Sequence, residues 1–202
     1  VKGGVRANAP LKPVTVNGSG TVVLADNVIV GGAGLQNVAV SLAPTATNVW
    51  LLRNAISAGV PAGSGATATV FGVNNLGVAA LWGNRITMGP GRTGSWGAAV
   101  QNYGTMRLVA NVLNGEEAGG VADYSYGLRN LKTDGGAPSA GTAWAANNVV
   151  FAGRGKMGSR GVLSNSPLVL VDNVLGDRVP GSLDWAYRPT ERAAALDVGF
   201  AS

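Results

Sequence analysis

Aliphatic residues recur along the chain in a fixed register with an asparagine. The six asparagines are Asn27, Asn54, Asn84, Asn111, Asn148 and Asn173, with spacings of 27, 30, 27, 37 and 25 residues. Three residues before each asparagine stands Leu24, Leu51, Leu81, Leu108, Ala145 or Leu170. Two residues after it stands Ile29, Ile56, Ile86, Leu113, Val150 or Leu175. Such self-similarity is typical of a solenoid, in which each repeat forms one coil that stacks on its neighbours.

Before each asparagine, the positions five and three residues earlier are both apolar, which predicts a β-strand with one face inside. We expect the leucines to stack as a core column, and the asparagine amides to hydrogen-bond from coil to coil. Asparagine also tolerates the left-handed backbone of a sharp corner, so we expect that conformation at these asparagines. Both features assign the asparagines a structural role.

A second recurrence precedes the first, by about nine residues at Asn75, Asn102 and Asn165 and by 18 at Asn130 in the longest coil. Two residues before these asparagines stand Val73, Val100, Leu128 and Leu163. Each coil therefore contains at least two short strands, followed by a glycine-rich return. The predicted fold class is all-β, a right-handed parallel β-helix of about six coils. We expect the coils over residues 20–178, a lead-in or N-terminal cap over 1–19 and a closing segment over 179–202.

Composition supports this picture and narrows the chemistry. Glycine accounts for 32 of 202 residues and charged residues for only 12%, which is typical of a β architecture with many tight turns. The net charge is +5, but the basic residues are dispersed, so we expect no nucleic-acid partner. The absence of cysteine and histidine excludes disulfides, Ser-His-Asp triads and histidine-based zinc sites.

Two features bear on context. No run of 18 apolar residues exists, so we expect no transmembrane helix. The chain begins at Val1 without a signal-peptide pattern, and we expect it to be a processed or excised piece of something longer.

The stacked segments LLRNAISAG and ALWGNRITMG resemble right-handed parallel β-helix proteins of the pectate-lyase-like superfamily. The stretch 184–199 is similar to the tail that closes many secreted bacterial members. Arg188-Pro189 and the run Ala195 to Gly199 match that tail, whereas Glu191-Arg192 replaces its Ser-Pro pair. The resemblance covers roughly residues 20–199 and implies the fold and an extracellular or cell-surface location. It implies no single activity, because the superfamily holds lyases, hydrolases, epimerases, tailspikes, adhesins and non-catalytic modules.

The lyases of that superfamily use calcium-binding acidic clusters, and the motifs that mark their active sites are absent from this sequence. The nearest acidic cluster is Glu116, Glu117 and Asp123, in the longest coil. Such a loop could hold Ca²⁺ through its carboxylates, although we favour a solubilising surface loop. No other cofactor is expected. A glycosidase needs two carboxyl groups facing each other, whereas Asp26 and Asp172 share a repeat position several coils apart.

The outer face of the main strand is unexpectedly apolar. Four residues before the asparagine stand Val23, Trp50, Ala80, Arg107, Trp144 and Val169, and two residues before it stand Ala25, Leu52, Trp82, Val109, Ala146 and Val171. An exposed sheet face is normally polar, yet eleven of these twelve residues are apolar. We define its central members as the outer patch, a candidate interface or sugar-stacking site: Trp50, Leu52, Trp82, Arg107, Val109 and Trp144.

Three explanations of the outer patch are open. Copies of the chain or another protein cover it, or the lead-in or the segment 178–202 folds over it, or it is an open platform for sugar rings. We expect the first, in a non-catalytic extracellular β-solenoid that is structural or adhesive and self-associates. The alternatives are a fragment of a polysaccharide-active enzyme, a lyase more than a hydrolase, on acidic glycans, and a glycan-binding module.

Overall fold

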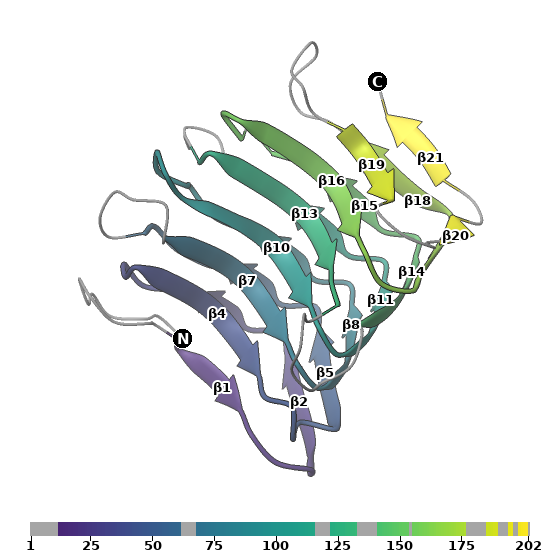
Figure 1. Ribbon diagram of the computed structural model, residues 1–202. Helices are drawn as coiled ribbons and strands as arrows, with labels where there is room; N and C mark the ends of the chain where they lie inside the picture. The colour runs from purple at the N-terminus through teal and green to yellow at the C-terminus, as the bar shows by residue number, and fades with distance from the viewer. Residues whose placement is uncertain are drawn as a thin grey trace.

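The computed structural model describes residues 12–61, 68–115, 122–132, 141–153, 155–176, 185–189, 194–195 and 198–201. Within these residues the secondary structure consists of strands joined by turns, arranged as three parallel sheets of seven strands (Figure 1). Each coil gives one strand to each sheet, so consecutive strands of one sheet lie a full coil apart in the sequence. The predicted parallel β-helix is therefore confirmed.

We number the sheets by their first strand. Sheet 1 contains β1 (Val14–Val16), β4 (Gln36–Leu42), β7 (Thr69–Asn75), β10 (Trp96–Asn102), β13 (Tyr124–Asn130), β16 (Gly158–Ser164) and β19 (Trp185–Pro189). Sheet 2 contains β2 (Thr21–Ala25), β5 (Asn48–Leu52), β8 (Val78–Trp82), β11 (Thr105–Val109), β14 (Thr142–Ala146), β17 (Leu168–Val171) and β20 (Ala194–Ala195). Sheet 3 contains β3 (Val28–Val30), β6 (Ala55–Ser57), β9 (Arg85–Thr87), β12 (Val112–Asn114), β15 (Val149–Phe151), β18 (Asn173–Gly176) and β21 (Val198–Ala201).

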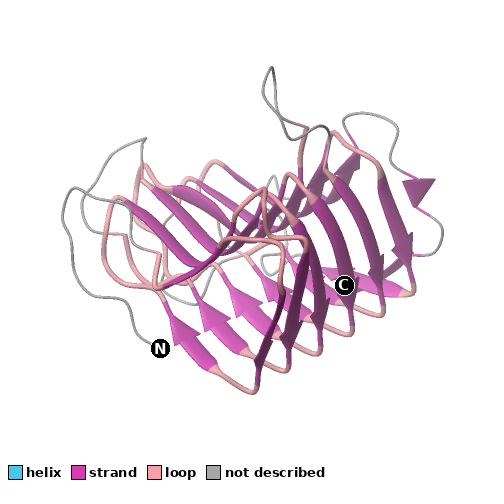
Figure 2. Cartoon of the chain, turned by 90° about the horizontal axis from the view of Figure 1, so that it is seen from below, coloured by secondary structure: helices cyan, strands magenta, loops and turns pink. Residues whose placement is uncertain are grey.

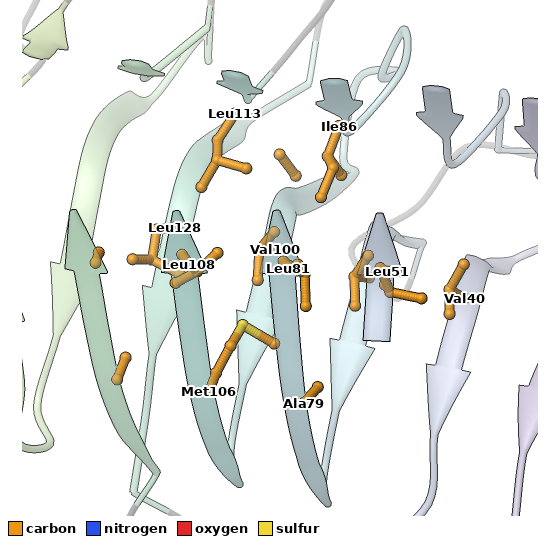
Figure 3. Packing of buried hydrophobic residues seen from close by; sticks show 14 of the residues in the cluster. Val40, Leu51, Ala79, Leu81, Ile86, Val100, Met106, Leu108, Leu113 and Leu128 are labelled. Carbon is orange, nitrogen blue, oxygen red and sulfur yellow. The ribbon is translucent and has the colours of Figure 1, made fainter. Parts of the chain in front are cut away.

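The predicted leucine column is stacked in line. Each member pairs with the equivalent residue of the next coil, in the order Leu24, Leu51, Leu81, Leu108, Ala145, Leu170. Leu51, Leu81, Leu108 and Leu170 are at most 1% exposed, whereas Leu24, in the first coil, is half-buried. Side chains of all three sheets meet in this core, as Leu81, Ile86 and Val100 show in Figure 3.

The predicted asparagine ladder is also present. From Asn27 to Asn148, the amide Nδ2 of each asparagine donates to Oδ1 of the asparagine in the next coil, over 2.9 to 3.1 Å. The same Oδ1 also accepts the backbone N–H of the preceding asparagine. From Asn54 onward, Nδ2 additionally donates to the carbonyl of the core column one coil earlier. These hydrogen bonds satisfy the amide groups of the asparagines, which are buried except for the half-buried Asn27. A buried polar group requires such partners.

The left-handed backbone is not at the asparagines, and that expectation was wrong. It falls one residue earlier, at Asp26, Arg53, Gly83, Ala110, Asn147 and Asp172, with φ between 48° and 65°. Five of these six are not glycine, although a side chain costs about 1–2 kcal/mol in this region. The ladder bonds made by the following asparagine fix the corner, so the strained residue needs no special side chain.

A second asparagine ladder joins the β-strands of sheet 1 at their carboxyl ends. Nδ2 of Asn75 donates to Asn102, and Nδ2 of Asn102 donates to Asn130, both over 2.8 Å. The assignment of Asn165 to this column was wrong, because Asn130 pairs with Ser164 and donates to its hydroxyl. Asn165 instead accepts the backbone N–H of Lys132.

The two ends of the stack are formed by β1–β3 and by β19–β21, which lie at opposite ends in Figure 1 and are joined by the array of parallel strands in Figure 2. The last three strands, β19, β20 and β21, pair in parallel with β16, β17 and β18, respectively. The described part of the C-terminal segment therefore lies at the end of the stack and not over the outer patch. Among the described residues there is no helix capable of crossing a membrane.

Candidate binding groove on sheet 2

Three columns of side chains face outward from sheet 2. The first is polar apart from Val78 and contains Thr21, Asn48, Val78, Thr105 and Thr142. The second contains Val23, Trp50, Ala80, Arg107, Trp144 and Val169, in register. The third contains Ala25, Leu52, Trp82, Val109, Ala146 and Val171. The structure therefore places all six outer-patch residues on one face, in two adjacent columns.

Ala80 forms the floor of a groove in this face. Its methyl group lies one coil from Trp50 and one coil from Arg107, so the surface is lower here than at the two large side chains on either side. The resulting cavity measures about 550 Å³ and is lined from Trp50 across Ala80 to Arg107 and Trp144. A smaller cavity of about 220 Å³ adjoins it beside Trp82 and Val109. Because parallel strands lie about 4.8 Å apart, the two walls are about 10 Å apart along the stack.

The first wall of the groove is the indole of Trp50, which is 40% exposed. Its Nε1 donates to Oδ1 of Asn48 over 2.8 Å. Nδ2 of Asn48 in turn donates to the hydroxyl of Thr21 in the coil before, over 2.7 Å. This chain of hydrogen bonds fixes the orientation of the ring, so its exposed surface is available without the loss of rotamer freedom on binding.

The second wall is the guanidinium of Arg107, supported by Trp144. The Cζ atom of Arg107 lies 4.6 Å from the centroid of the Trp144 ring. A cation over an indole face is attracted by the ring quadrupole. The stacked arginine covers that face and keeps its N–H donors at its edges, where they can reach a ligand. No carboxylate is among the residues that line the groove.

Sequence reasoning placed the outer patch on one face but missed two features of it. The polar column beside the tryptophans was not recognised, although Asn48, Thr105 and Thr142 stand at the same repeat position. The pairing of Arg107 with Trp144 was also missed. The signal was the placement of an arginine and a tryptophan at equivalent positions of consecutive coils.

Sheet 1 carries a second aromatic cluster on its outer face, which the sequence analysis did not identify. Phe71, Tyr126 and Ala98 are buried, and Trp96 packs against them with its ring at 72° to that of Phe71. The Cζ atom of Arg129 lies 4.4 Å from the Trp96 centroid and 5.0 Å from the Tyr126 centroid. Burial lowers the pKa of Arg129, and its Nη1 donates to Oε1 of Gln101. The arginine covers these rings.

The acidic candidates do not come together as a site in the described residues. Glu116 and Glu117 lie outside them. Oδ1 of Asp123 accepts the backbone N–H of Gly94, a contact between neighbouring coils. No group of three or more acidic, cysteine or histidine side chains that could hold a metal ion occurs in the portion of the chain that is described. The calcium site therefore stays a prediction.

One ion pair borders sheet 2. Asp26 accepts hydrogen bonds from Nε and Nη2 of Arg53, one coil away, over 2.8 and 2.7 Å. These bonds hold the pKa of the Asp26 carboxyl below its ordinary value. Both side chains are more than 60% exposed, so the pair contributes little to stability.

Comparison of the chain with protein-family models and with curated proteins finds no match.

Proposed function

We propose that the chain is a non-catalytic, adhesive β-solenoid that binds a polysaccharide in the groove between Trp50 and Arg107. The observation that supports this function best is the combination of a fixed, exposed indole with an adjacent column of hydroxyl and amide groups. Sugar rings present an apolar face that stacks on aromatic rings and a polar rim that needs hydrogen-bond partners. The groove offers both within one shallow cavity.

The dimensions of the groove favour an extended glycan. The floor at Ala80 extends one coil toward Trp50 and one coil toward Arg107. The spacing of adjacent coils is close to the length of one pyranose unit in an extended glycan. The exposed Trp82 continues the apolar surface in the neighbouring column. A polysaccharide thus fits the site as a short run of rings, which is the geometry of an adhesive module.

The proposal includes kinship with the pectate-lyase-like superfamily and an extracellular or cell-surface location. Its support is the parallel β-helix together with the resemblance of the coil and tail motifs. The backbone of β19, β20 and β21, in the segment that resembles the closing tail, completes one more coil.

Binding to polysaccharides tests the proposal directly. The chain would be incubated with insoluble cellulose, chitin, xylan and cross-linked polygalacturonate, and the depletion from solution would be measured. We expect at least one polymer to retain the protein, and Trp50→Ala to weaken that binding by about tenfold, the loss typical of an aromatic anchor. Tyr124→Ala removes an exposed ring from sheet 1 and serves as the matched control. Retention of none of these polymers would refute the proposal.

Self-association is the second candidate function. The observation in its favour is the large exposure of Trp82 and Val23, at 56% and 54%, on a face that is largely apolar. If copies meet there, the double variant Trp50→Asp plus Val109→Asp lowers the oligomeric mass measured by light scattering. If the groove serves glycans, wild type and variant both have the mass of one chain.

An acidic-glycan lyase is the third alternative, and a sensitive assay addresses it. Incubation with polygalacturonate and calcium is expected to give no rise in ultraviolet absorbance from unsaturated ends. A steady rise with enzyme concentration would assign the chain to the catalytic members of the superfamily.

A further inference from the structure

The groove has walls of different chemistry, and this difference bears on which sugars it selects. The inference rests on the proposed function. Trp50 offers an apolar surface, whereas Arg107 offers only hydrogen-bond donors, because a guanidinium has no acceptor. A ring stacked against Trp50 and seated over Ala80 therefore directs one substituent toward Arg107.

We infer that the groove selects glycans whose rings carry a planar oxygen acceptor, a carboxylate or an N-acetyl carbonyl, and that Arg107 recognises this oxygen. A guanidinium donates two parallel hydrogen bonds to a carboxylate and donates readily to a carbonyl oxygen, whereas a hydroxyl also carries a donor that the guanidinium cannot accept. Arg107 is the only charged residue among those that line the groove, so no carboxylate of the protein competes there for its donors.

Trp144 is the positioning residue for this contact. Its ring holds the guanidinium 4.6 Å from its centroid, on the side of the groove opposite Trp50. An arginine on an exposed strand otherwise samples many rotamers, and fixing it in advance lowers the entropy lost on binding. Trp144 therefore contributes to selectivity through Arg107 without contacting the acceptor itself.

The test uses three soluble β-1,4-linked oligosaccharides of equal length, made of glucose, N-acetylglucosamine or glucuronate. Their affinities would be measured by calorimetry. We expect the N-acetylglucosamine or the glucuronate oligomer to bind about tenfold more tightly than the glucose oligomer, as for a hydrogen bond to a charged group. A preference confined to glucuronate that declines with added salt identifies the carboxylate, and a salt-insensitive preference for N-acetylglucosamine identifies the carbonyl.

Variants separate recognition from folding. Arg107→Met is expected to abolish the preference, because the affinities for the N-acetylglucosamine and glucuronate oligomers fall to that for the glucose oligomer once the guanidinium is lost. Trp144→Leu is expected to reduce the preference several-fold. Arg85→Met, at another exposed arginine on the outer face of sheet 3, is the matched control and leaves all three affinities unchanged.

Two results would overturn the inference while the proposed function stands. One is equal affinity of the wild-type chain for the three oligomers. The other is an Arg107→Met variant that loses affinity for all three to the same extent. Failure of every oligomer and every insoluble polymer to bind would instead refute the proposed function, and the inference with it.

Discussion

The outer faces of sheets 1 and 2 carry the same motif with opposite outcomes. In sheet 1 the column Phe71, Ala98, Tyr126 places an alanine between two aromatic rings, and Ala98 is fully buried. In sheet 2, Ala80 lies in the same way between Trp50 and Arg107, but it remains partly exposed at the floor of a groove. An alanine between large neighbours thus creates a notch on both faces, and only one notch is filled.

The residue two positions before each alanine explains the difference. Trp96 precedes Ala98, and its ring packs against the cluster that contains Ala98, under the guanidinium of Arg129. Val78 precedes Ala80 and is itself 42% exposed. A valine is too small to cover the notch. Whether an aromatic face becomes part of the folded core or a binding surface therefore depends here on one neighbouring side chain.

Truncation of a ring on each face should give the largest contrast in stability. Phe71→Ala removes a buried ring and is expected to lower the free energy of unfolding by about 3–5 kcal/mol. Trp50→Ala, at an exposed ring, is expected to cost less than about 1 kcal/mol beyond its hydrogen bond to Asn48. Denaturant unfolding measures both. Equal losses would mean that the sheet 2 face is also covered in solution.

Removal of the two stacked arginines should give a smaller contrast. Arg129→Met loses contacts with two rings and a hydrogen bond to Gln101, and is expected to cost about 1–2 kcal/mol. Arg107→Met, at an exposed guanidinium, is expected to stay within about 0.5 kcal/mol of wild type. Thermal unfolding of both variants provides the comparison. A more stable Arg129→Met protein would show that the burial of this charge outweighs its ring contacts.

Filling the open notch sharpens the comparison further. Val78→Trp places on sheet 2 the ring that sheet 1 has at Trp96. We expect this variant to remain folded, with a stability change within about 1 kcal/mol, and to lose glycan binding about tenfold or more because the groove over Ala80 is occupied. Val78→Thr is the matched control that leaves the notch open. Undiminished binding by Val78→Trp would show that glycans bind elsewhere.

The corner beside sheet 2 should give the smallest effect, and one that depends on pH. Because Arg53 lowers the pKa of Asp26 in the folded chain, the pair stabilises the fold above the ordinary carboxyl pKa. This contribution is lost as the pH falls through the lowered value. Thermal midpoints measured from neutral to acidic pH in low salt should therefore decline slightly more for wild type than for Arg53→Met. High salt should remove the difference, since both groups are exposed.

The coil architecture was predictable because stacking imposes one chemistry at each repeat position. Leu81 and Asn84 stand in columns whose members must match, so a single sequence shows the pattern without a structure. The asparagine ladder, whose Nδ2 atoms donate to backbone carbonyls of the core column, was equally constrained. These positions are determined by neighbours of the same kind, a coil before and a coil after.

The aromatic cluster of sheet 1 was not predictable in the same way. In its strands two consecutive residues, such as Ala39 and Val40, both belong to the core, so the period of two changes phase within one strand. Outward positions before this change of phase, such as Phe71, are therefore out of step with those after it. The groove was missed for another reason: its shape depends on the size of Ala80 and on the stacking of Arg107, which no repeat rule determines.

The left-handed corner residues lie at regular intervals along the stack, one in each coil. The residues that take the left-handed conformation differ in charge, size and polarity, from aspartate to glycine, yet all six are exposed and hold nearly the same φ. Because the hydrogen bonds of the following ladder asparagine hold this conformation, the side chain at the corner position can be replaced. Spectroscopic labels attached there would stand in a straight row at multiples of about 4.8 Å. The molecule thus offers a rigid support on which distances between attached groups are set by counting coils.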